Sequence, residues 1–352
     1  MKYSPMSTVA KAAATYVGTI IGAGFASGQE IVQFFSCYGS LGLIGIAVAT
    51  LLFAWLGYAL LELGYSLKAD SYSSAMYALC GPYIGMLLDI VTVIFLFTTL
   101  SIMLAGATTL LTECFNLPYA LSLCAASALI IITSSRGVNG ISSANMVIAP
   151  LLIFSIISIC VYSFFYHSFS SATLPPFFPY DSTTFFHCLV ASFLYVSYNL
   201  VMGATVLIPL GKTIRNHRCR FLSGVIGGTV LGLLAAFLAV VILLHYPAAL
   251  YQEVPLLEIA SNQYSWSGIA YTCTLIAAMY TTAIASLYGC TVKISQVTKN
   301  SFHFSMLAIT CLAAVFSNVG FAALIRIMFP LFGWATLIFT FRLLWVSIRD
   351  IR

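Results

Sequence analysis

The sequence predicts an all-α membrane protein with ten transmembrane helices, arranged as two inverted repeats of five. Three observations lead to this fold class. Hydrophobic residues make up 61% of the 352-residue chain and charged residues only 7%, whereas a soluble domain carries roughly 25% charged residues. Ten apolar runs of about twenty residues are each long enough to cross a bilayer as a helix. Two of these runs, five apart in order, contain residues that interrupt helices.

We number the apolar runs in chain order as spans 1 to 10. The expected spans cover about 9–36, 40–63, 84–112, 117–135, 140–166, 184–210, 221–245, 266–292, 303–318 and 321–345. No polar stretch between them is long enough for a separate soluble domain. We therefore expect a single transmembrane domain over 1–352, with repeat one at about 9–166 and repeat two at about 184–345.

The distribution of basic residues independently supports an even number of spans. With ten spans and both termini in the cytoplasm, thirteen of the fourteen Lys and Arg residues lie on the inner side, and only Arg326 lies in the outer half. Cytoplasmic loops of membrane proteins carry such an excess of basic residues. One span more or fewer would destroy this asymmetry. We therefore expect a multi-pass protein of the cytoplasmic membrane with both ends inside.

Span 1 contains four glycines in eleven residues, in the stretch V-G-T-I-I-G-A-G-F-A-S-G-Q-E from Val17 to Glu30. Glycine in a helix interior costs roughly 0.5–1 kcal/mol relative to alanine. A broken helix leaves main-chain groups unpaired at bilayer depth, which is tolerated only where they are buried in protein or line a cavity. We therefore predict a break that binds a ligand through its backbone. A break that is filled by neighbouring side chains and binds nothing is the alternative.

The two sides of this break suit opposite charges. Amides exposed at the start of the second half-helix favour an anion, most simply a carboxylate. The residues predicted to bind it are Gly22, Ala23, Gly24 and Phe25. The carbonyls left on the first half-helix, near Gly18 and Ile21, point the other way and suit a cation.

Span 6 is the second segment that we expect to be interrupted. Ser197 and Asn199 can compete for backbone hydrogen bonds, and Gly203 weakens the helix directly after them. Released carbonyls between Tyr195 and Tyr198 would suit an ammonium group, and Tyr195, Tyr198 and Phe25 could wall a side-chain pocket. A carboxylate subsite and an ammonium subsite together describe an amino acid. Neither break contains an acidic residue, so the sequence favours a small or apolar neutral amino acid.

These residues resemble a known superfamily. G-T-I-I-G-A-G at 18–24 resembles the span-1 signature of the amino acid–polyamine–organocation transporters, and the fuller pattern is similar to the YkvI-like bacterial membrane proteins of that superfamily. The matching motifs are G-T-I-I-G-A-G-F-A-S-G-Q-E at 18–30, Y-V-S-Y-N-L at 195–200, M-Y-T-T-A at 279–283 and F-P-L-F-G at 329–333. The resemblance implies a LeuT-like fold, unwound helices 1 and 6, and sodium- or proton-coupled alternating access.

The resemblance also implies a sodium site between spans 1 and 8. Its expected ligands are Gly18, Ile21, Ala278, Thr281 and Thr282. The oxygen atoms of this set are the type of ligand that a hard cation prefers. The alternative is that the threonine hydroxyls only bond back to the preceding turn of their own helix. Proton-coupled relatives often carry a lysine in span 5, and its absence between Asn139 and Phe165 favours sodium without excluding a carboxylate carrier elsewhere.

Charged residues inside membrane spans are costly and often functional. Glu30 and Arg326 fall at similar depth in the outer halves of spans 1 and 10, and we predict that they meet as part of an extracellular gate. Two unrelated charges that reach for the interface are the alternative. Glu62 and Asp89 are expected to reach the cytoplasmic interface. The segment 245–265 contains enough apolar residues to fold back as a short helical lid.

Taken together, the sequence predicts a sodium-coupled transporter of a small neutral amino acid or similar zwitterion. A proton-coupled carrier of another small solute and a ligand sensor with a transporter fold are the alternatives. The chain contains no H-E-x-x-H, G-x-S-x-G or P-loop motif, which disfavours an enzyme. Its ten cysteines form no C-x-x-C pair, so we expect no cofactor apart from the coupling ion. The expected partners are the substrate and the lipid bilayer, not nucleic acid, and the oligomeric state is left open.

Overall fold

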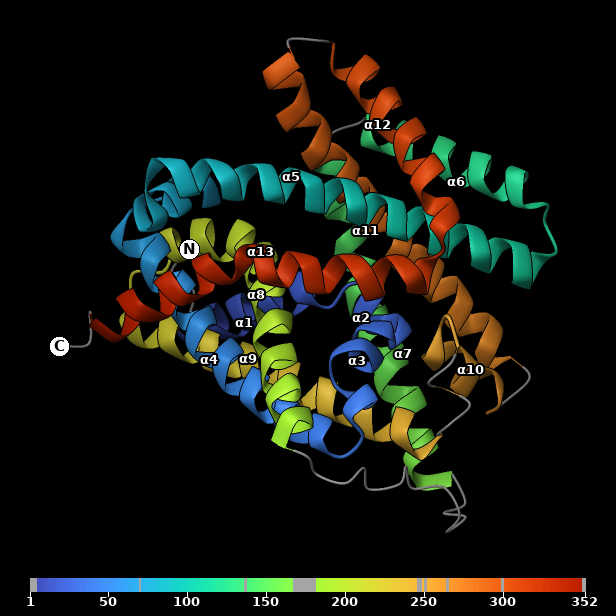
Figure 1. Cartoon of the computed structure of the whole chain (residues 1–352), viewed down its shortest axis with the longest axis horizontal. Coiled ribbons are helices and arrows are strands. Elements are labelled where there is room, and N and C mark those ends of the chain that lie inside the picture. Colours follow the sequence, from blue (N-terminus) through green and yellow to red (C-terminus); the bar gives the residue numbers. More distant parts are fainter. Residues whose placement is uncertain are drawn as a thin grey trace.

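The chain folds into a bundle of helices, several of which are long enough to cross a bilayer (Figure 1). The structure is a computed structural model that describes residues 5–69, 71–135, 138–166, 182–245, 249, 252–263, 266–298 and 301–349. All regular secondary structure in these ranges is helical. Seven helical segments combine the length and the apolar composition of a transmembrane span. They are Leu41–Ser66, Tyr72–Glu113, Thr183–Thr213, His217–Leu244, Ser267–Ser295, Phe302–Val319 and Phe321–Arg349.

The first half of the chain starts with a broken helix and continues with four further helices. The broken helix consists of α1 (Pro5–Ile20), α2 (Ala23–Ser27) and α3 (Gln29–Phe34), followed by the 3-10 turn η1 (Ser36–Tyr38). The helices after it are α4 (Leu41–Ser66), α5 (Tyr72–Phe115), α6 (Tyr119–Ser134) and α7 (Val138–Tyr166). Helix α5 begins well before the predicted span at 84–112, since it includes a further helical segment before a kink. The kink lies at Gly81, whose φ of 79° is left-handed, and Pro82 follows it.

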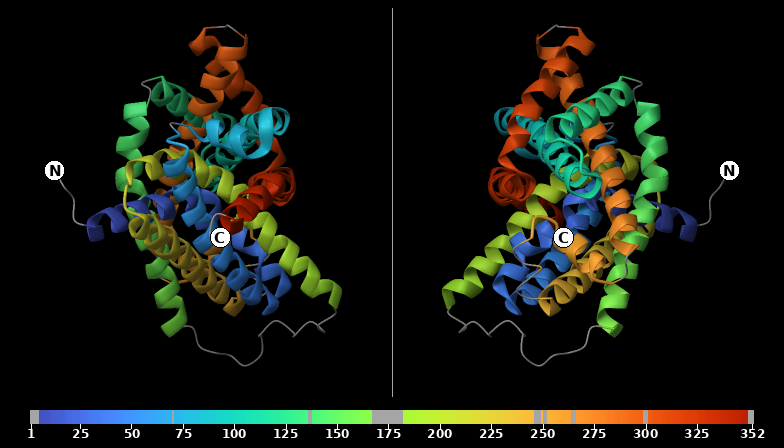
Figure 2. Two further views of the ribbon diagram at one scale, coloured as in Figure 1. Left: turned by 90° about the vertical axis from the view of Figure 1, so that its left-hand side faces the viewer. Right: turned by 90° about the vertical axis from the view of Figure 1, so that its right-hand side faces the viewer.

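The second half repeats the pattern of long helices and adds a short one. It contains α8 (Ser182–Thr213), α9 (His217–Leu244), the seven-residue α10 (Pro255–Ser261), α11 (Ser267–Thr298), α12 (Phe302–Phe316), the 3-10 turn η3 (Ser317–Val319) and α13 (Phe321–Arg349). The short helix α10 confirms the helical segment predicted within 245–265. Figure 2 shows that the ends of α11 and α12 where they meet project beyond the rest of the bundle.

Helix α8 differs from the prediction because it is continuous over Ser182–Thr213. Its polar residues find partners without breaking the helix. Asn199 donates from Nδ2 to the carbonyl oxygen of Tyr195 one turn earlier, at 3.0 Å. The Ser197 hydroxyl is hydrogen-bonded to Thr336 and Thr340 of α13, at 2.8 and 3.0 Å. The predicted interruption of span 6 is therefore wrong for this structure, because neighbouring groups satisfy the residues that suggested it.

Close packing around α4 holds the centre of the bundle together. Helix α4 packs against both α8 and α9. A Cβ atom at Gly64 would lie 2.0 Å from the carbonyl oxygen of Ile208, and one at Gly211 would lie 2.1 Å from that of Leu61. Small residues of this kind let membrane helices approach until their backbones touch. This packing holds α8 against α4, and α8 also contacts α1.

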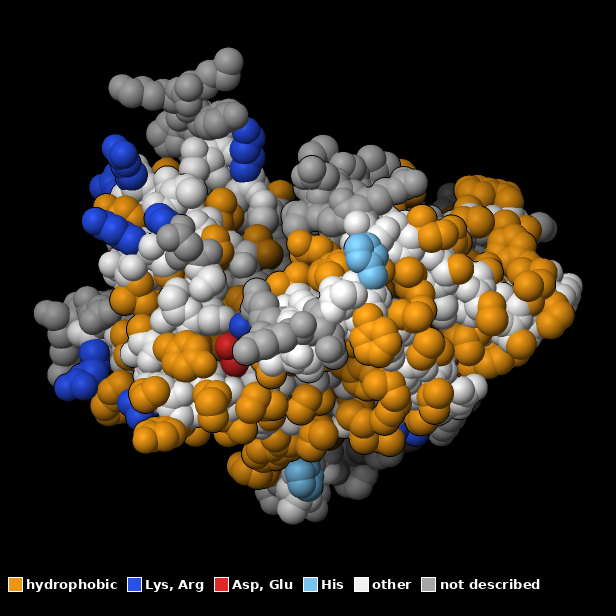
Figure 3. Space-filling view, turned by 90° about the horizontal axis from the view of Figure 1, so that it is seen from above, with side chains coloured by type: hydrophobic (Ala, Val, Ile, Leu, Met, Phe, Trp, Pro, Cys, Tyr) orange, Lys and Arg blue, Asp and Glu red, His pale blue; other side chains and the backbone are white. Residues whose placement is uncertain are grey.

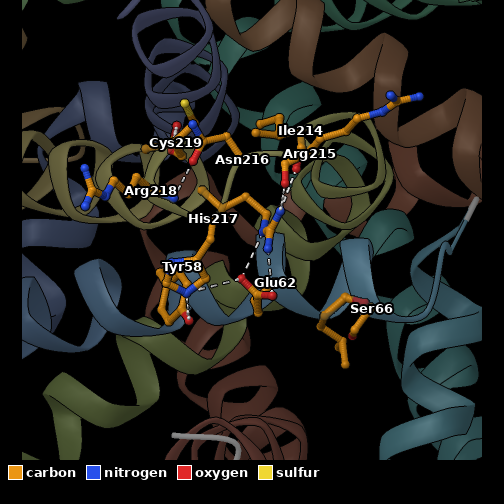
Figure 4. Close-up of polar contacts among 12 residues, drawn as sticks. Tyr58, Glu62, Ser66, Ile214, Arg215, Asn216, His217, Arg218 and Cys219 are labelled. Atoms are coloured by element: carbon orange, nitrogen blue, oxygen red, sulfur yellow. Dashed lines mark hydrogen bonds and ion pairs between the residues drawn. The ribbon is translucent and has the colours of Figure 1, made fainter. Parts of the chain in front are cut away.

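Lys and Arg side chains gather at the left of the face seen in Figure 3, which we call the basic end, whereas hydrophobic side chains cover much of the middle and right. At this end Arg220 of α9 forms a bidentate ion pair with Glu62 of α4, with both N–O distances at 2.9 Å (Figure 4). Its Nη1 atom also donates to the carbonyls of Ile214 and Arg215, which follow the end of α8 at Thr213. Asp89 pairs with Lys293 at 3.0 Å. Glu62 and Asp89 therefore join helices rather than simply reaching for the interface.

Candidate functional site

The first helix comes apart at Ile21 and Gly22, near the middle of its span. Gly22 is extended, with φ −101° and ψ −174°, and α2 starts at the next residue. The amide of Ala26 donates to the Gly22 carbonyl at 3.0 Å, and it is the first amide after the break to enter the helical ladder. The three amides before it, at residues 23–25, lack partners of this kind, as the first amides of any helix do. The break predicted in span 1 is present.

A second bend at Gly28 turns the chain back on itself. Gly28 has φ 85°, a left-handed conformation that residues other than glycine rarely adopt. The hydroxyl of Ser27 donates to the Gly24 carbonyl at 2.7 Å and accepts the Gln29 amide at 3.2 Å, which stabilises the bend. As a result Glu30 lies beside Gly24, so close that a Cβ atom on Gly24 would lie 2.2 Å from Glu30 Oε1. In a straight helix these two positions would be about 120° apart around the axis and about 9 Å apart along it.

The break lines a large cavity of about 1540 Å³. Its walls come from α1, α2, α5, α7, α8, α9 and α11, with Glu30 of α3 and Phe329 of α13. Most lining residues are apolar, and the polar ones include Glu30, beside Gly24, and Thr282, beside Gly22. A pocket for one small ligand is about 300–1,000 Å³. The cavity is therefore large enough for a binding site and a route that leads to it.

The two ends of this route differ. Toward the basic end of the bundle the cavity runs along α1 and α11 as far as Tyr72 and Lys293. At the other end α2 and α3 are tied to the elements above them. Tyr271 of α11 donates its hydroxyl to the Ala26 carbonyl, and Gln29 Nε2 donates to the Gln252 carbonyl at 2.5 Å. Gly28 also lies against Pro255 at the start of α10. The cavity is thus covered beside α10, and its lining extends to the basic end.

The structure brings some of the predicted substrate-binding residues to the cavity and leaves others out. Those that line it are Gly22, Ala23, Gly24, Tyr198 and Asn199. Phe25 is buried in the core, with 1% of its surface exposed. Tyr195 is enclosed by the rings of Phe34, Phe35 and Phe53, and Ser197 faces α13. Because α8 is continuous, the carbonyls between Tyr195 and Tyr198 are not released as predicted.

All five residues of the predicted cation set line the same cavity. They are Gly18, Ile21, Ala278, Thr281 and Thr282. Both threonine hydroxyls donate to the Ala278 carbonyl, at 3.0 and 2.9 Å, as the alternative interpretation required. A hydroxyl that donates in this way keeps its lone pairs, so it can still accept a cation. Thr282 Oγ1 would be 4.0 Å from a Cβ atom on Gly22, so α11 reaches the break itself.

The predicted gate between Glu30 and Arg326 is wrong, because the structure does not bring these residues together. The Arg326 side chain is exposed, whereas Glu30 is buried and accepts a hydrogen bond from the Tyr198 hydroxyl at 2.8 Å. The left-handed turn at Gly28 explains the difference, since it directs Glu30 inward. An acidic residue therefore does lie at the break, contrary to the sequence interpretation. The signal that could have revealed it is the Ser-Gly pair at 27–28, which is typical of a turn.

Comparison with known proteins agrees with this description. No family model matches the chain. The uncharacterized membrane protein YkvI of Bacillus subtilis is 30% identical over 329 residues, which cover 92% of each chain. Among solved structures, MhsT in complex with L-phenylalanine has a TM-score of 0.64 at 16% identity and covers 95% of this chain and 86% of its own.

Two further solved structures share the fold. Mhp1 in an inward-facing conformation has a TM-score of 0.56 at 11% identity and covers 94% of this chain and 73% of its own. A mutant of the Eremococcus coleocola manganese transporter has a TM-score of 0.52 at 16% identity and covers 96% and 85%. At these identities the likeness concerns the fold alone. By its relative and its architecture, this chain is a multi-pass membrane protein with a LeuT-like fold and belongs to the YkvI family.

Proposed function

We propose that the protein is a secondary active transporter that carries a small neutral amino acid, or a similar zwitterion, across the bacterial cytoplasmic membrane together with sodium. The observation that carries this proposal is the cavity at the α1–α2 break, which is closed at one end and extends to the other. Alternating access requires a central site that communicates with one side at a time. A channel would need a path that is open at both ends.

The proposal includes a topology of ten spans with both termini in the cytoplasm. In this orientation the end of the bundle that contains Lys293 and Arg220 faces inward, as the positive-inside rule requires. The described form is then the inward-open one. Helix α10 closes the outer end above Gly28. The curated relative comes from a bacterium, which supports placement in a bacterial membrane.

A zwitterionic substrate suits the chemistry at the break. Main-chain amides of α2 favour an anionic group, and the surrounding walls are apolar. MhsT, which has the same fold, was solved with L-phenylalanine bound. That complex supports an amino acid as the substrate class for this chain.

Sodium is the proposed coupling ion because all five candidate ligand residues line the cavity and one of them, Thr282, lies beside Gly22 at the break. Carbonyl and hydroxyl oxygens are the ligands that a hard monovalent cation takes. A specific observation favours proton coupling as the second candidate, namely the buried carboxyl of Glu30 in the same cavity. Buried carboxyl groups serve as proton carriers in many transporters.

The proposal is tested by uptake of labelled amino acids into vesicles that contain the purified protein, with an inward gradient of either sodium or protons. A parallel thermal-shift screen of amino acids detects binding, since a bound ligand raises the apparent melting temperature. Sodium-driven uptake supports the proposal, and proton-driven uptake supports the second candidate. Binding without uptake would identify a sensor. If no amino acid is bound or carried in either gradient, the substrate class is wrong.

The cation set is tested by Thr282→Ala, which removes one hydroxyl that lines the cavity. We expect the sodium concentration for half-maximal uptake to rise by about tenfold, the effect of losing one oxygen ligand worth about 1.4 kcal/mol. Thr291→Ala is the matched control. That hydroxyl also bonds to the preceding turn of α11, at Leu287, but Thr291 does not line the cavity. An unchanged sodium response in the Thr282 variant would remove this residue from the set.

A further inference from the structure

We propose that Glu30, together with the rings of Phe95, Tyr198 and Phe329, forms an anionic aromatic subsite that binds the cationic nitrogen of the transported solute. The ligand class is an organic ammonium group, either that of an amino acid or that of a simple amine. This inference deepens the proposed function and rests on the binding of a solute in the same cavity. It assigns the ammonium group to a side chain rather than to main-chain carbonyls.

The first support is the state of the Glu30 carboxyl. Its side chain is within the cavity wall and only 6% exposed. One oxygen, Oε2, accepts the Tyr198 hydroxyl at 2.8 Å, whereas Oε1 has no hydrogen-bond donor among the described residues. Glu30 also pairs with no Lys or Arg in the part of the chain that the structure describes, where the ion pairs involve Glu62 and Asp89. A buried carboxyl without a cation ionises only at a cost and otherwise holds a proton, so a ligand that supplies a cation would favour its charged form.

The second support is the set of rings beside this carboxyl. Phe95 of α5, Tyr198 of α8 and Phe329 of α13 all line the cavity. Their centroids are 5.0 Å apart for Tyr198 and Phe329, 6.0 Å for Phe95 and Phe329, and 6.1 Å for Phe95 and Tyr198. The rings are tilted by 39–49° to one another, so they do not stack flat. A cation within about 6 Å of a ring centroid is attracted by the ring face.

The third support is that α8 does not offer released main-chain carbonyls, the other group that could bind an ammonium. The sequence suggested carbonyls released by a break in span 6, but α8 is continuous there. Its Tyr195 carbonyl already accepts the Asn199 side chain at 3.0 Å. A helix carbonyl is also held in the helical ladder. Glu30 is then the strongest acceptor that the described cavity wall offers to a cationic nitrogen.

The position of Glu30 also orients a zwitterionic ligand. Because Oε1 lies against Gly24, an ammonium group bound by Glu30 would lie on the Gly24 side of the break. Two carboxylates in contact repel each other, so the carboxylate of the ligand cannot share that position. It would lie toward Gly22 and Thr282, on the side of the proposed cation set. The ammonium and the sodium ion would then occupy opposite ends of the ligand.

The test measures calorimetric binding of three matched probes to the purified full-length protein in 150 mM sodium chloride. The probes are L-phenylalanine, with both groups, 2-phenylethylamine, with only the amine, and 3-phenylpropionate, with only the carboxylate. We expect the wild type to bind the two amines and to bind phenylpropionate about tenfold or more weakly. Glu30→Gln should weaken both amines by about tenfold or more, because it removes the charge and keeps the shape. Glu113→Gln, at an exposed acidic residue, is the control and should bind them as the wild type does.

A second variant keeps the test independent of how well Glu30→Gln folds. Phe329→Leu keeps an apolar side chain but removes a ring, and it should weaken both amines by about three- to tenfold without affecting phenylpropionate. Unaltered amine binding in both variants would overturn the subsite while leaving the amino acid class intact. Unaltered binding in Glu30→Gln, with loss of proton-driven uptake, would also overturn it and assign Glu30 to proton transfer. Binding of phenylethylamine but of no amino acid would support the subsite and contradict the proposed substrate.

Discussion

Gly24→Ala tests the position of Glu30 with the smallest available change. The added Cβ atom would lie 2.2 Å from Glu30 Oε1 and 3.1 Å from Cδ, and real Cβ contacts essentially never fall below 3.0 Å. The carboxyl must therefore shift by about 0.8 Å, the difference between the 2.2 Å contact with Oε1 and the lower limit of 3.0 Å. A shift of this size along the 2.8 Å bond from Tyr198 would lengthen it to about 3.6 Å, which is outside hydrogen-bonding range. A hydrogen bond to a charged group contributes about 1.5–3 kcal/mol.

The loss should appear in binding more than in stability. If the correct position of the carboxyl is needed by the ligand, 1.5–3 kcal/mol corresponds to a loss of about 10- to 150-fold in affinity for a ligand with a cationic nitrogen. The displaced side chain can move into the cavity, and alanine stabilises a helix by about 0.5–1 kcal/mol relative to glycine. We therefore expect the melting temperature to stay close to that of the wild type.

The assay is calorimetric titration with 2-phenylethylamine and L-phenylalanine, and Gly203→Ala is the control. At Gly203 of α8 an added Cβ atom meets its nearest neighbours at 3.7–3.9 Å, which is ordinary contact. Wild-type affinity in Gly24→Ala would refute the reasoning. So would equal losses in both variants, because the effect would then come from any added methyl group near the centre of the bundle.

Two further predictions concern the ends of the molecule. The side chains of Glu62 and Arg220 are 30% and 4% exposed. A double-mutant cycle of Glu62→Gln and Arg220→Met should give a coupling energy of about 2 kcal/mol, less than for a fully buried pair because Glu62 is partly solvated. Thermal unfolding in detergent measures this energy, and additive effects of the two substitutions would contradict the prediction. Tyr271→Phe removes the hydroxyl that donates to the Ala26 carbonyl beside α10, so in the proposed orientation the outward-open population should rise by about two- to tenfold. Labelling of Leu256→Cys by an impermeant maleimide, followed by mass spectrometry, measures this opening, and an unchanged rate would show that the hydroxyl does not hold the end closed.

The parts of the fold that local sequence could predict are those in which one segment decides its own structure. Apolar runs reveal helices because a bilayer requires apolar surface and internal hydrogen bonds over about twenty residues. The break in the first helix was also predictable, since four glycines lie within eleven residues. The structure refines their roles. Gly22 has φ −101° and room for a Cβ atom, whereas Gly24 and Gly28 are constrained by Glu30 and by a positive φ.

The errors arose where distant residues decide the outcome. The same Ser, Asn and Gly in α8 are compatible with a broken or a continuous helix. The partners of Ser197 on α13 decide between these, and they are 139 and 143 residues away in the chain. A straight helix beyond the break predicts that Glu30 meets Arg326. The left-handed turn at Gly28 instead brings the Glu30 carboxyl beside Gly24, in the cavity wall.

The difference between the broken first helix and the continuous α8 changes how selectivity can arise. A break separates α1 from α2 whereas α8 is continuous, so the cavity receives main-chain groups from α1 and α2 but side chains from α8. Main-chain carbonyls are the same whatever the sequence, and changing them requires refolding a helix. A carboxyl such as Glu30 can be exchanged by one substitution while the helix around it is kept. If the ammonium group is bound by that side chain, Glu30→Gln should change which class of solute the protein accepts, and the fold should survive. A helix break at both positions would have made selectivity far less dependent on any single residue.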